Sequence, residues 1–266
     1  YRALLIGEAN YMDPDNDLNG PKEDTDVMTA ILKQAKTPYN CVKRYNQTKG
    51  QILSLIANSF RNANDYDVSL FYYSGHGATD YDETYSGALF TVDEELLTMS
   101  ELAAALGKVP GKVIVILDSC GSGASITQRS ASASLNPSLF QQDMMRAFKA
   151  ADTEAKGTKY GELRKSKFVV ICAASAHQYS YTDPVQDAPE GTWGGRLTVS
   201  ITMGAGCTYP YGTYYNRMPA DKNSDGTLTL AEIYRYVETL VSNYESRQTT
   251  MVYPSATSTY PVLIRK

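Results

Sequence analysis

Short apolar runs alternate along the chain with longer segments in which apolar residues recur at helical spacing. The runs have the length of strands and are apolar at nearly every position, which is typical of strands buried on both faces of a parallel sheet. We expect such strands at residues 3–7, 41–45, 68–73, 113–117 and 168–172.

The segments between these runs begin with helix-start signals. Pro21 suits the first position of a helix, because that position needs no N–H donor. Thr48 with Gln51, and Thr98 with Glu101, form capping boxes in which each side chain satisfies a backbone donor of the other residue. The order βαβαβ predicts an α/β fold, a three-layer α/β/α sandwich around a mostly parallel six-stranded sheet. Ligands of such sheets bind beyond the carboxyl ends of the strands.

The composition indicates one globular domain over residues 1–266, with 42% hydrophobic and 20% charged residues. A net charge of -4 and a pI near 5.3 provide no basic face, so no nucleic-acid partner is expected. No run of about 18 apolar residues is present, so no membrane span is expected. The chain begins at Tyr1 inside an apolar run, as a processed or trimmed form would.

Two of the expected strands end in glycine-flanked residues that can carry chemistry. The third strand runs into Gly-His76-Gly, and the fourth runs into Asp-Ser-Cys120-Gly. Because the carboxyl ends of neighbouring parallel strands meet at one edge, this imidazole and this thiol are expected to lie close together. The alternative is a turn histidine and a structural thiol at a strand end. The other histidine, His177, follows the fifth expected strand, where a loop role is the simpler interpretation.

The other three cysteines carry less information. Four cysteines are too few for a disulfide scaffold in a chain of this length, and none forms a CxxC pair for zinc, so free thiols are expected. Cys41 and Cys172 fall within apolar strands and are expected in the core, and Cys207 gives no signal of its own.

Two sequence blocks resemble those of a known family. FYYSGHG and VIVILDSCGSG are similar to the histidine and cysteine blocks of the caspase-like cysteine peptidases of the caspase/clostripain clan, closest to metacaspases and their bacterial relatives. The resemblance extends to LNGPKEDTDVM, VVICAASAHQYSY and GGRLTVSITMG, and so covers nearly the whole chain. Two departures are Pro21-Lys22-Glu23 in place of the usual Cys-x-Asn, and Gly121 where many metacaspases carry His.

This resemblance implies a cysteine endopeptidase that needs no cofactor for its chemistry. Cys120 would attack a peptide carbonyl to form a thioester, and His76 would protonate the leaving amine. The amides of Gly77 and Cys120 are the expected oxyanion donors, because both follow a strand end where N–H groups are left unpaired. A caspase-fold binding module without turnover is the alternative. A serine hydrolase using Ser119 or Ser122 is disfavoured, since the sequence lacks GxSxG.

Acidic residues near the two blocks predict the substrate. Asp118 lies on the same side of its strand as Cys120, by two-residue alternation. The resemblance matches Asp24 to a second acid of the first substrate pocket, and it places Ser175 at the border of that pocket. Two carboxylates there would select a peptide or protein substrate with Arg or Lys at the cleaved position. The alternative is that Asp24 charges the first turn of a helix and Asp118 ends a strand.

A second motif, DKNSDGTLTLAE at residues 221–232, fits the twelve-position calcium loop. Its expected ligands are Asp221, Asn223, Asp225, Thr227 and Glu232. The segment before the loop is no convincing helix, so this is at best half of an EF-hand. A polar turn capped by Thr229 and Glu232 explains the same residues without calcium. Both interpretations stay open.

Residues 124–167, which are first rich in Ser and Ala and then charged, are expected to form a long surface insertion. The segment leaves the cysteine block directly and contains basic residues of the type that two carboxylates would accept, at Arg129, Lys156, Lys159, Arg164 and Lys165. Because tethering raises the effective concentration of a cleavage site, we expect self-processing within this segment.

Overall fold

The computed structural model describes residues 1–78, 87–121, 137–157, 166–175, 182–184, 193–215, 217–243 and 248–265. For Cys120 and Ser175 the description is of the backbone. Within these residues, no helix is both long enough and apolar enough to cross a membrane.

The main sheet has six strands in line, and five of them run parallel. Its order is β2 (Asn40–Tyr45), β1 (Arg2–Gly7), β3 (Val68–Ala78), β6 (Lys112–Gly121), β7 (Phe168–Ser175) and the antiparallel β11 (Gln248–Tyr253). Two short strands extend it beside β3, namely β4 (Ala88–Phe90) and β5 (Leu96–Thr98). Two small ribbons pair β10 (Thr227–Thr229) with β12 (Pro261–Ile264) and β8 (Thr182–Pro184) with β9 (Trp193–Gly195).

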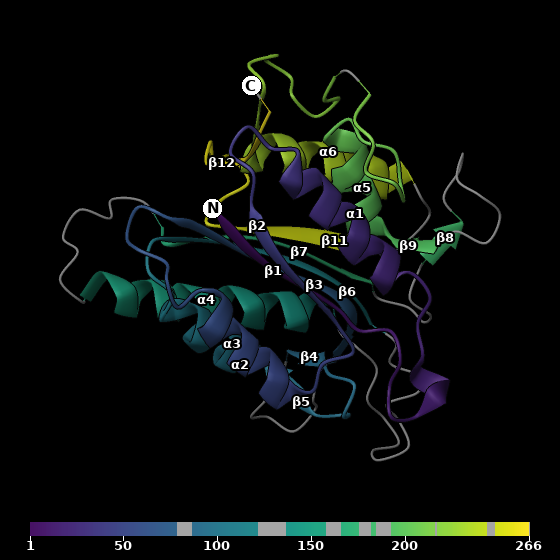
Figure 1. Cartoon of the computed structure of the whole chain (residues 1–266), viewed down its shortest axis with the longest axis vertical. Helices are drawn as coiled ribbons and strands as arrows, with labels where there is room; N and C mark the ends of the chain where they lie inside the picture. The colour runs from purple at the N-terminus through teal and green to yellow at the C-terminus, as the bar shows by residue number, and fades with distance from the viewer. Residues whose placement is uncertain are drawn as a thin grey trace.

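Helices cover both faces of the sheet, which confirms the three-layer prediction (Figure 1). One layer contains α1 (Pro21–Lys33), α5 (Arg196–Gly204) and α6 (Leu230–Asn243), and the other contains α2 (Lys49–Ser59), α3 (Met99–Gly107) and α4 (Pro137–Gly157). Successive residues of β3 supply the two cores in turn: Leu70 and Tyr72 pack into the first, Phe71 and Tyr73 into the second. This alternation follows from the pleat of a strand buried on both faces.

The expected helix starts are present. Pro21 is the first residue of α1, after Gly20 with φ 111°, a conformation that a residue with a Cβ rarely adopts. The capping boxes of Thr48 and Thr98 are both formed, with the threonine side chain accepting from the third helical amide in each helix. These interactions fix where α2 and α3 begin, and so how β2 and β5 lead into them.

Two expectations about the fold need correction. Strand β2 is not buried on both faces: it lies at the edge of the sheet and most of its residues are partly or fully exposed. The expected surface insertion 124–167 contains helix α4, which packs on α3 and β7 and buries Met144 and Phe148 completely. Apolar side chains one helical turn apart give α4 a core-facing stripe, so residues 137–157 belong to the second helix layer.

Candidate active site

The sheet register brings the two candidate catalytic residues together. Strands β3 and β6 are parallel neighbours, and their pairing sets His76 opposite Cys120 and Ser74 opposite Asp118. On the other side of β6, Cys120 pairs with Ser175 of β7. Both strands continue past the residues expected to end them, so His76 and Cys120 are strand residues and not turn residues. Adjacent partners in a sheet present their side chains on the same face.

His76 is buried among aromatic residues, with 2% of its surface exposed. Its ring lies 4.8 Å from that of Tyr11 and 6.4 Å from that of Phe90, measured between centroids. Its Nε2 atom lies 2.8 Å from the carbonyl oxygen of Asn16, in the short helix η1 (Pro14–Asn16). A carbonyl oxygen can only accept, so Nε2 donates and therefore carries a proton. The contact holds the ring in one tautomer.

Asp24 and Asp118, together called the carboxylate pair, lie close to the candidate dyad of His76 and Cys120. Asp118 comes two residues before Cys120 on β6, and the Asp24 side chain reaches Ser74 of β3 from α1. A Cβ placed on Gly195 would lie 2.3 Å from Asp118 Oδ2 and 2.9 Å from Asp24 Oδ2, so the two oxygens are at most about 5 Å apart. Both residues are almost completely buried. Gly195 is therefore a position where a side chain would collide with both carboxylates.

The Asp24 carboxylate accepts hydrogen bonds from residues outside its own helix. Although Asp24 lies in the first turn of α1, its carboxylate accepts hydrogen bonds from Ser74 Oγ at 2.8 Å, from the Gly195 amide at 3.0 Å and from Tyr209 Oη at 2.9 Å. Asp118 Oδ2 accepts from the amide and the hydroxyl of Thr198, at 2.8 and 2.7 Å. Its other oxygen, Oδ1, is buried and has no hydrogen-bond partner of good geometry among the described residues, although the Leu197 backbone also interacts with this carboxylate.

Burial raises the pKa of both carboxyl groups. The negative charge of Asp118 raises the pKa of Asp24 further, and the hydrogen bonds from Ser74, Tyr209 and Gly195 oppose this. Within the described part of the chain, no basic side chain contributes to either shift. The pair is therefore a buried acidic site without a described positive partner, an arrangement that favours binding of a cation from outside.

The residues of this site that were not found from the sequence include Ser74, Asn16, Tyr209, Gly195 and Thr198. Ser74 had a readable signal, because it precedes His76 by two residues and so shares its face of β3. Asn16 acts through a backbone carbonyl, which has no sequence signature. Tyr209 lies 185 residues from Asp24 and reaches it only in the folded chain.

The other predicted residues have mixed outcomes. Gly77 is not at a strand end: it is paired with Leu89 of β4 and Gly121 of β6, so the reason given for an unpaired amide there is wrong. Cys172 is fully buried, and burial raises the pKa of its thiol. Cys41 is only partly buried. His177 lies outside the described residues.

The segment 221–232 forms a tightly hydrogen-bonded turn. Asp221 accepts from the amides of Asp225 and Gly226, and Gly226 has the positive φ, 80°, that this position requires. Glu232 accepts from the amide and hydroxyl of Thr229, whose side chain caps α6 in return. The hydrogen bonds of the predicted capped turn are therefore present in the structure. Among the described residues, no three acidic, histidine or cysteine side chains are grouped so as to hold a metal.

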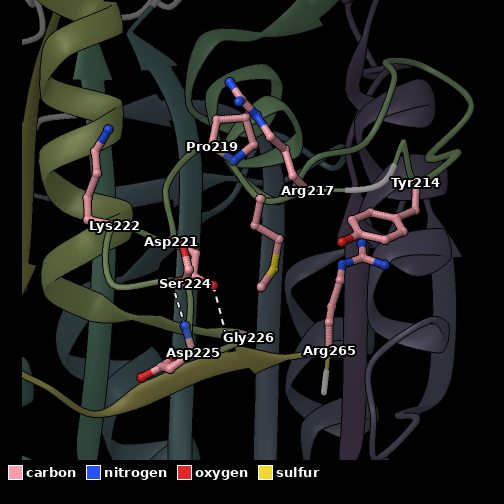
Figure 2. A pocket seen from close by; sticks show the side chains of 10 residues that line it. Tyr214, Arg217, Pro219, Asp221, Lys222, Ser224, Asp225, Gly226 and Arg265 are labelled. Atoms are coloured by element: carbon pink, nitrogen blue, oxygen red, sulfur yellow. Dashed lines mark hydrogen bonds between the residues drawn. The ribbon is translucent and has the colours of Figure 1, made fainter.

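Figure 2 shows the surroundings of this turn. Asp221, Lys222, Ser224 and Asp225 line a pocket together with Arg217 and Arg265. Asn223 and Thr227 belong to the same hydrogen-bonded turn. The Asn223 side chain donates to the Asp225 carboxylate and accepts from the Asp225 amide, and the Thr227 amide donates to the Asp225 carboxylate.

Comparison with known proteins settles the family. A family model described as the caspase domain matches residues 1–261. The chain belongs to the caspase family. Members of this family are cysteine peptidases that act on proteins or peptides, so His76, Cys120 and the carboxylate pair lie in a caspase domain. No curated protein sequence matches the chain.

Solved structures show that the caspase fold extends over almost the whole chain. A protein from Geobacter sulfurreducens is 21% identical, with a TM-score of 0.54 over 95% of this chain and 92% of that one. Caspase-1 from Spodoptera frugiperda is 10% identical, with a TM-score of 0.54 over 98% of this chain and 87% of that one. The Drosophila initiator caspase Dronc is 10% identical, with a TM-score of 0.53 and coverages of 97% and 80%. At these identities the likeness shows the fold.

Proposed function

We propose that this chain is a cysteine endopeptidase that cleaves peptide bonds after Arg or Lys, with Cys120 as nucleophile and His76 as proton-transfer partner. The observation that carries the specificity is the carboxylate pair. It is buried, its member Asp118 lies two residues before Cys120 on β6, and Asp118 Oδ1 has no hydrogen-bond partner of good geometry among the described residues. A guanidinium or ammonium group brings both a positive charge and several N–H donors to such a site.

The proposed reaction uses the tautomer that Asn16 supports. With Nε2 engaged as a donor, Nδ1 of His76 is the nitrogen that takes the thiol proton as Cys120 Sγ attacks the peptide carbonyl carbon. Nδ1 then gives this proton to the leaving amine as the C–N bond breaks, and a thioester remains. A water molecule next attacks the thioester, passing its proton through Nδ1 to the departing Cys120 thiolate. The cycle needs no cofactor.

The test is a set of fluorogenic peptides that differ only at the cleaved position, which is Arg, Lys, citrulline or Asp. Citrulline has the shape of Arg without its charge, so the ratio of kcat/KM for Arg over citrulline measures recognition of the charge. We expect this ratio to exceed roughly tenfold, the scale of one hydrogen bond to a charged group. Cleavage after Asp should be the slowest, because a third carboxylate would be repelled.

Substitutions of the carboxylate pair test which residues recognise the positive charge of the substrate. Asp118→Asn and Asp24→Asn should each lower cleavage after Arg and leave cleavage after citrulline nearly unchanged. Asp152→Asn is the matched control, because Asp152 is a buried carboxylate of α4 bonded to Ser166 and Lys167, at the opposite end of β7. Equal cleavage after Arg and citrulline would refute the specificity. Peptide binding without any product would instead support a caspase-fold binding module.

A further inference from the structure

Tyr209 joins the carboxylate pair to the backbone of β9. The residue follows α5, is 6% exposed, and places its Oη atom 2.9 Å from Asp24 Oδ1 and 2.9 Å from the carbonyl oxygen of Trp193. A Cβ on Gly194 would lie 2.5 Å from the same Oη, so the glycine allows β9 to pass directly against the phenol. The hydroxyl is thus held between two acceptors from distant parts of the chain.

A phenol has one proton, and these two acceptors compete for it. When Asp24 is ionised, its carboxylate is the stronger acceptor and Tyr209 donates to it. When Asp24 is protonated, its own O–H can donate to the Tyr209 oxygen, and Tyr209 then donates to Trp193. The second acceptor distinguishes Tyr209 from a simple structural tie, because its hydrogen bond follows the charge of Asp24.

We propose that Tyr209 is a positioning and specificity-determining residue, whose hydroxyl keeps Asp24 oriented and ionised for a guanidinium or ammonium group of the substrate. This rests on the proposed cleavage after Arg or Lys. Tyr209 acts through Asp24 and need not touch the substrate. Burial and the charge of Asp24 raise the pKa of Tyr209, so it remains a proton donor over the working pH range.

Other charges around Asp24 define the pH behaviour. Among the described residues, the ionisable groups that interact with the pair are Tyr72 of β3, Cys172 of β7 and Tyr209 after α5, and Glu23 of α1 acts on Tyr209. The charge of Asp118 raises the pKa of Asp24, and the hydrogen bond from Tyr209 lowers it. Removing the hydroxyl therefore raises this pKa, and ionisation of Asp24 moves to higher pH.

The variant is Tyr209→Phe, and Tyr39→Phe is its matched control. Tyr39 is 4% exposed and its hydroxyl has no hydrogen-bond partner in the described part of the chain, so the control removes a buried phenolic oxygen away from the pair. For Tyr209→Phe we expect kcat/KM for Arg peptides to fall roughly tenfold at the acidic end of the pH range of activity, mainly through KM, and to recover as the pH rises. Cleavage after citrulline and the control variant should show no such pH dependence. A loss that is equal at every pH, or confined to kcat, would overturn the proposal.

Binding without turnover gives a second measurement. In a Cys120→Ala background, calorimetry with acetyl-arginine amide and acetyl-citrulline amide should show selective loss of the arginine ligand in Tyr209→Phe. In an Asp24→Asn background, Tyr209→Phe should have little further effect, because the partner is already neutral. If the protein with Tyr209 and the Tyr209→Phe variant prefer arginine equally, the proposed role of Tyr209 is wrong and the proposed specificity still stands. If the protein with Tyr209 intact has no preference, the proposed specificity fails and this assignment fails with it.

Discussion

Glu8 follows strand β1 with its side chain fully buried, and both of its carboxylate oxygens lie 3.0 Å from the amide nitrogen of Gln47. Burial raises the pKa of this carboxyl from its ordinary value of 4.5 to about 8, the charge of Asp93 adds to the rise, and the Gln47 hydrogen bond opposes it. Because Gln has nearly the shape of a protonated Glu, Glu8→Gln keeps the packing and removes the ionisation. We expect this variant to be more stable than the wild type at neutral pH.

The magnitude follows from the two ionisation ranges. Below pH 4.5 the carboxyl is protonated in the folded and the unfolded chain, and it costs no stability. Between pH 4.5 and about 8 the unfolded chain releases the proton and the folded chain keeps it, so the free energy of unfolding falls by about 1.4 kcal/mol per pH unit. At pH 7 the accumulated loss is about 3 kcal/mol, and above pH 8 the loss no longer grows.

Urea unfolding at pH 5, 6, 7 and 8 measures this difference directly. The gap between Glu8→Gln and the wild type should be small at pH 5 and should widen to about 3 kcal/mol at pH 7. Glu154→Gln, an exposed change on α4, is the control and should give a gap near zero at every pH. A constant gap for Glu8→Gln, or a variant less stable than the wild type at pH 8, would refute the reasoning.

Three further outcomes are expected. Cys120→Ala should lower peptide cleavage by about a thousandfold or more with the melting temperature retained, and retained turnover would contradict the assigned nucleophile. Calcium, if bound by residues 221–232, should raise the melting temperature of the wild type and not that of Asp225→Ala; equal responses would leave the capped turn as the full explanation. Wild type should show new termini after Arg or Lys within residues 124–167 by mass spectrometry, outside α4, while Cys120→Ala stays intact. Intact chains in an active wild-type sample would exclude self-cleavage as a requirement.

The sheet and the closeness of His76 to Cys120 could be predicted from the sequence because both depend on local patterns. Apolar runs mark strands buried on both faces, and two-residue alternation puts Asp118 and Cys120 on one side of β6. The register of β3 and β6 then follows from parallel packing and sets His76 beside Cys120. Strand ends were less predictable, since glycine suggested a turn where the ladder in fact continues to Ala78 and Gly121.

The surroundings of Asp24 could not be predicted, because its donors come from 50, 171 and 185 residues away. No local pattern marks Tyr209 or the Gly195 amide as partners of a residue in α1. Helix α4 is a different case. Its buried residues Met144, Phe148 and Ala151 recur at helical spacing, and this signal was obscured by the Ser- and Ala-rich sequence before it.

Three buried carboxyl groups lie at or against the carboxyl ends of the strands, and their hydrogen bonds differ: Glu8 follows β1, Asp118 is in β6, and Asp24 reaches Ser74 of β3 from α1. Both oxygens of Glu8 meet the Gln47 amide, and nothing about it requires a further partner. Asp118 has one oxygen bonded twice to Thr198 and one buried oxygen that has no partner of good geometry among the described residues. Under the proposed function, a bound guanidinium or ammonium group would supply a donor to that oxygen. Neutralising Glu8 should therefore raise stability without changing cleavage, whereas Asp118→Asn should lower cleavage after Arg whatever it does to stability.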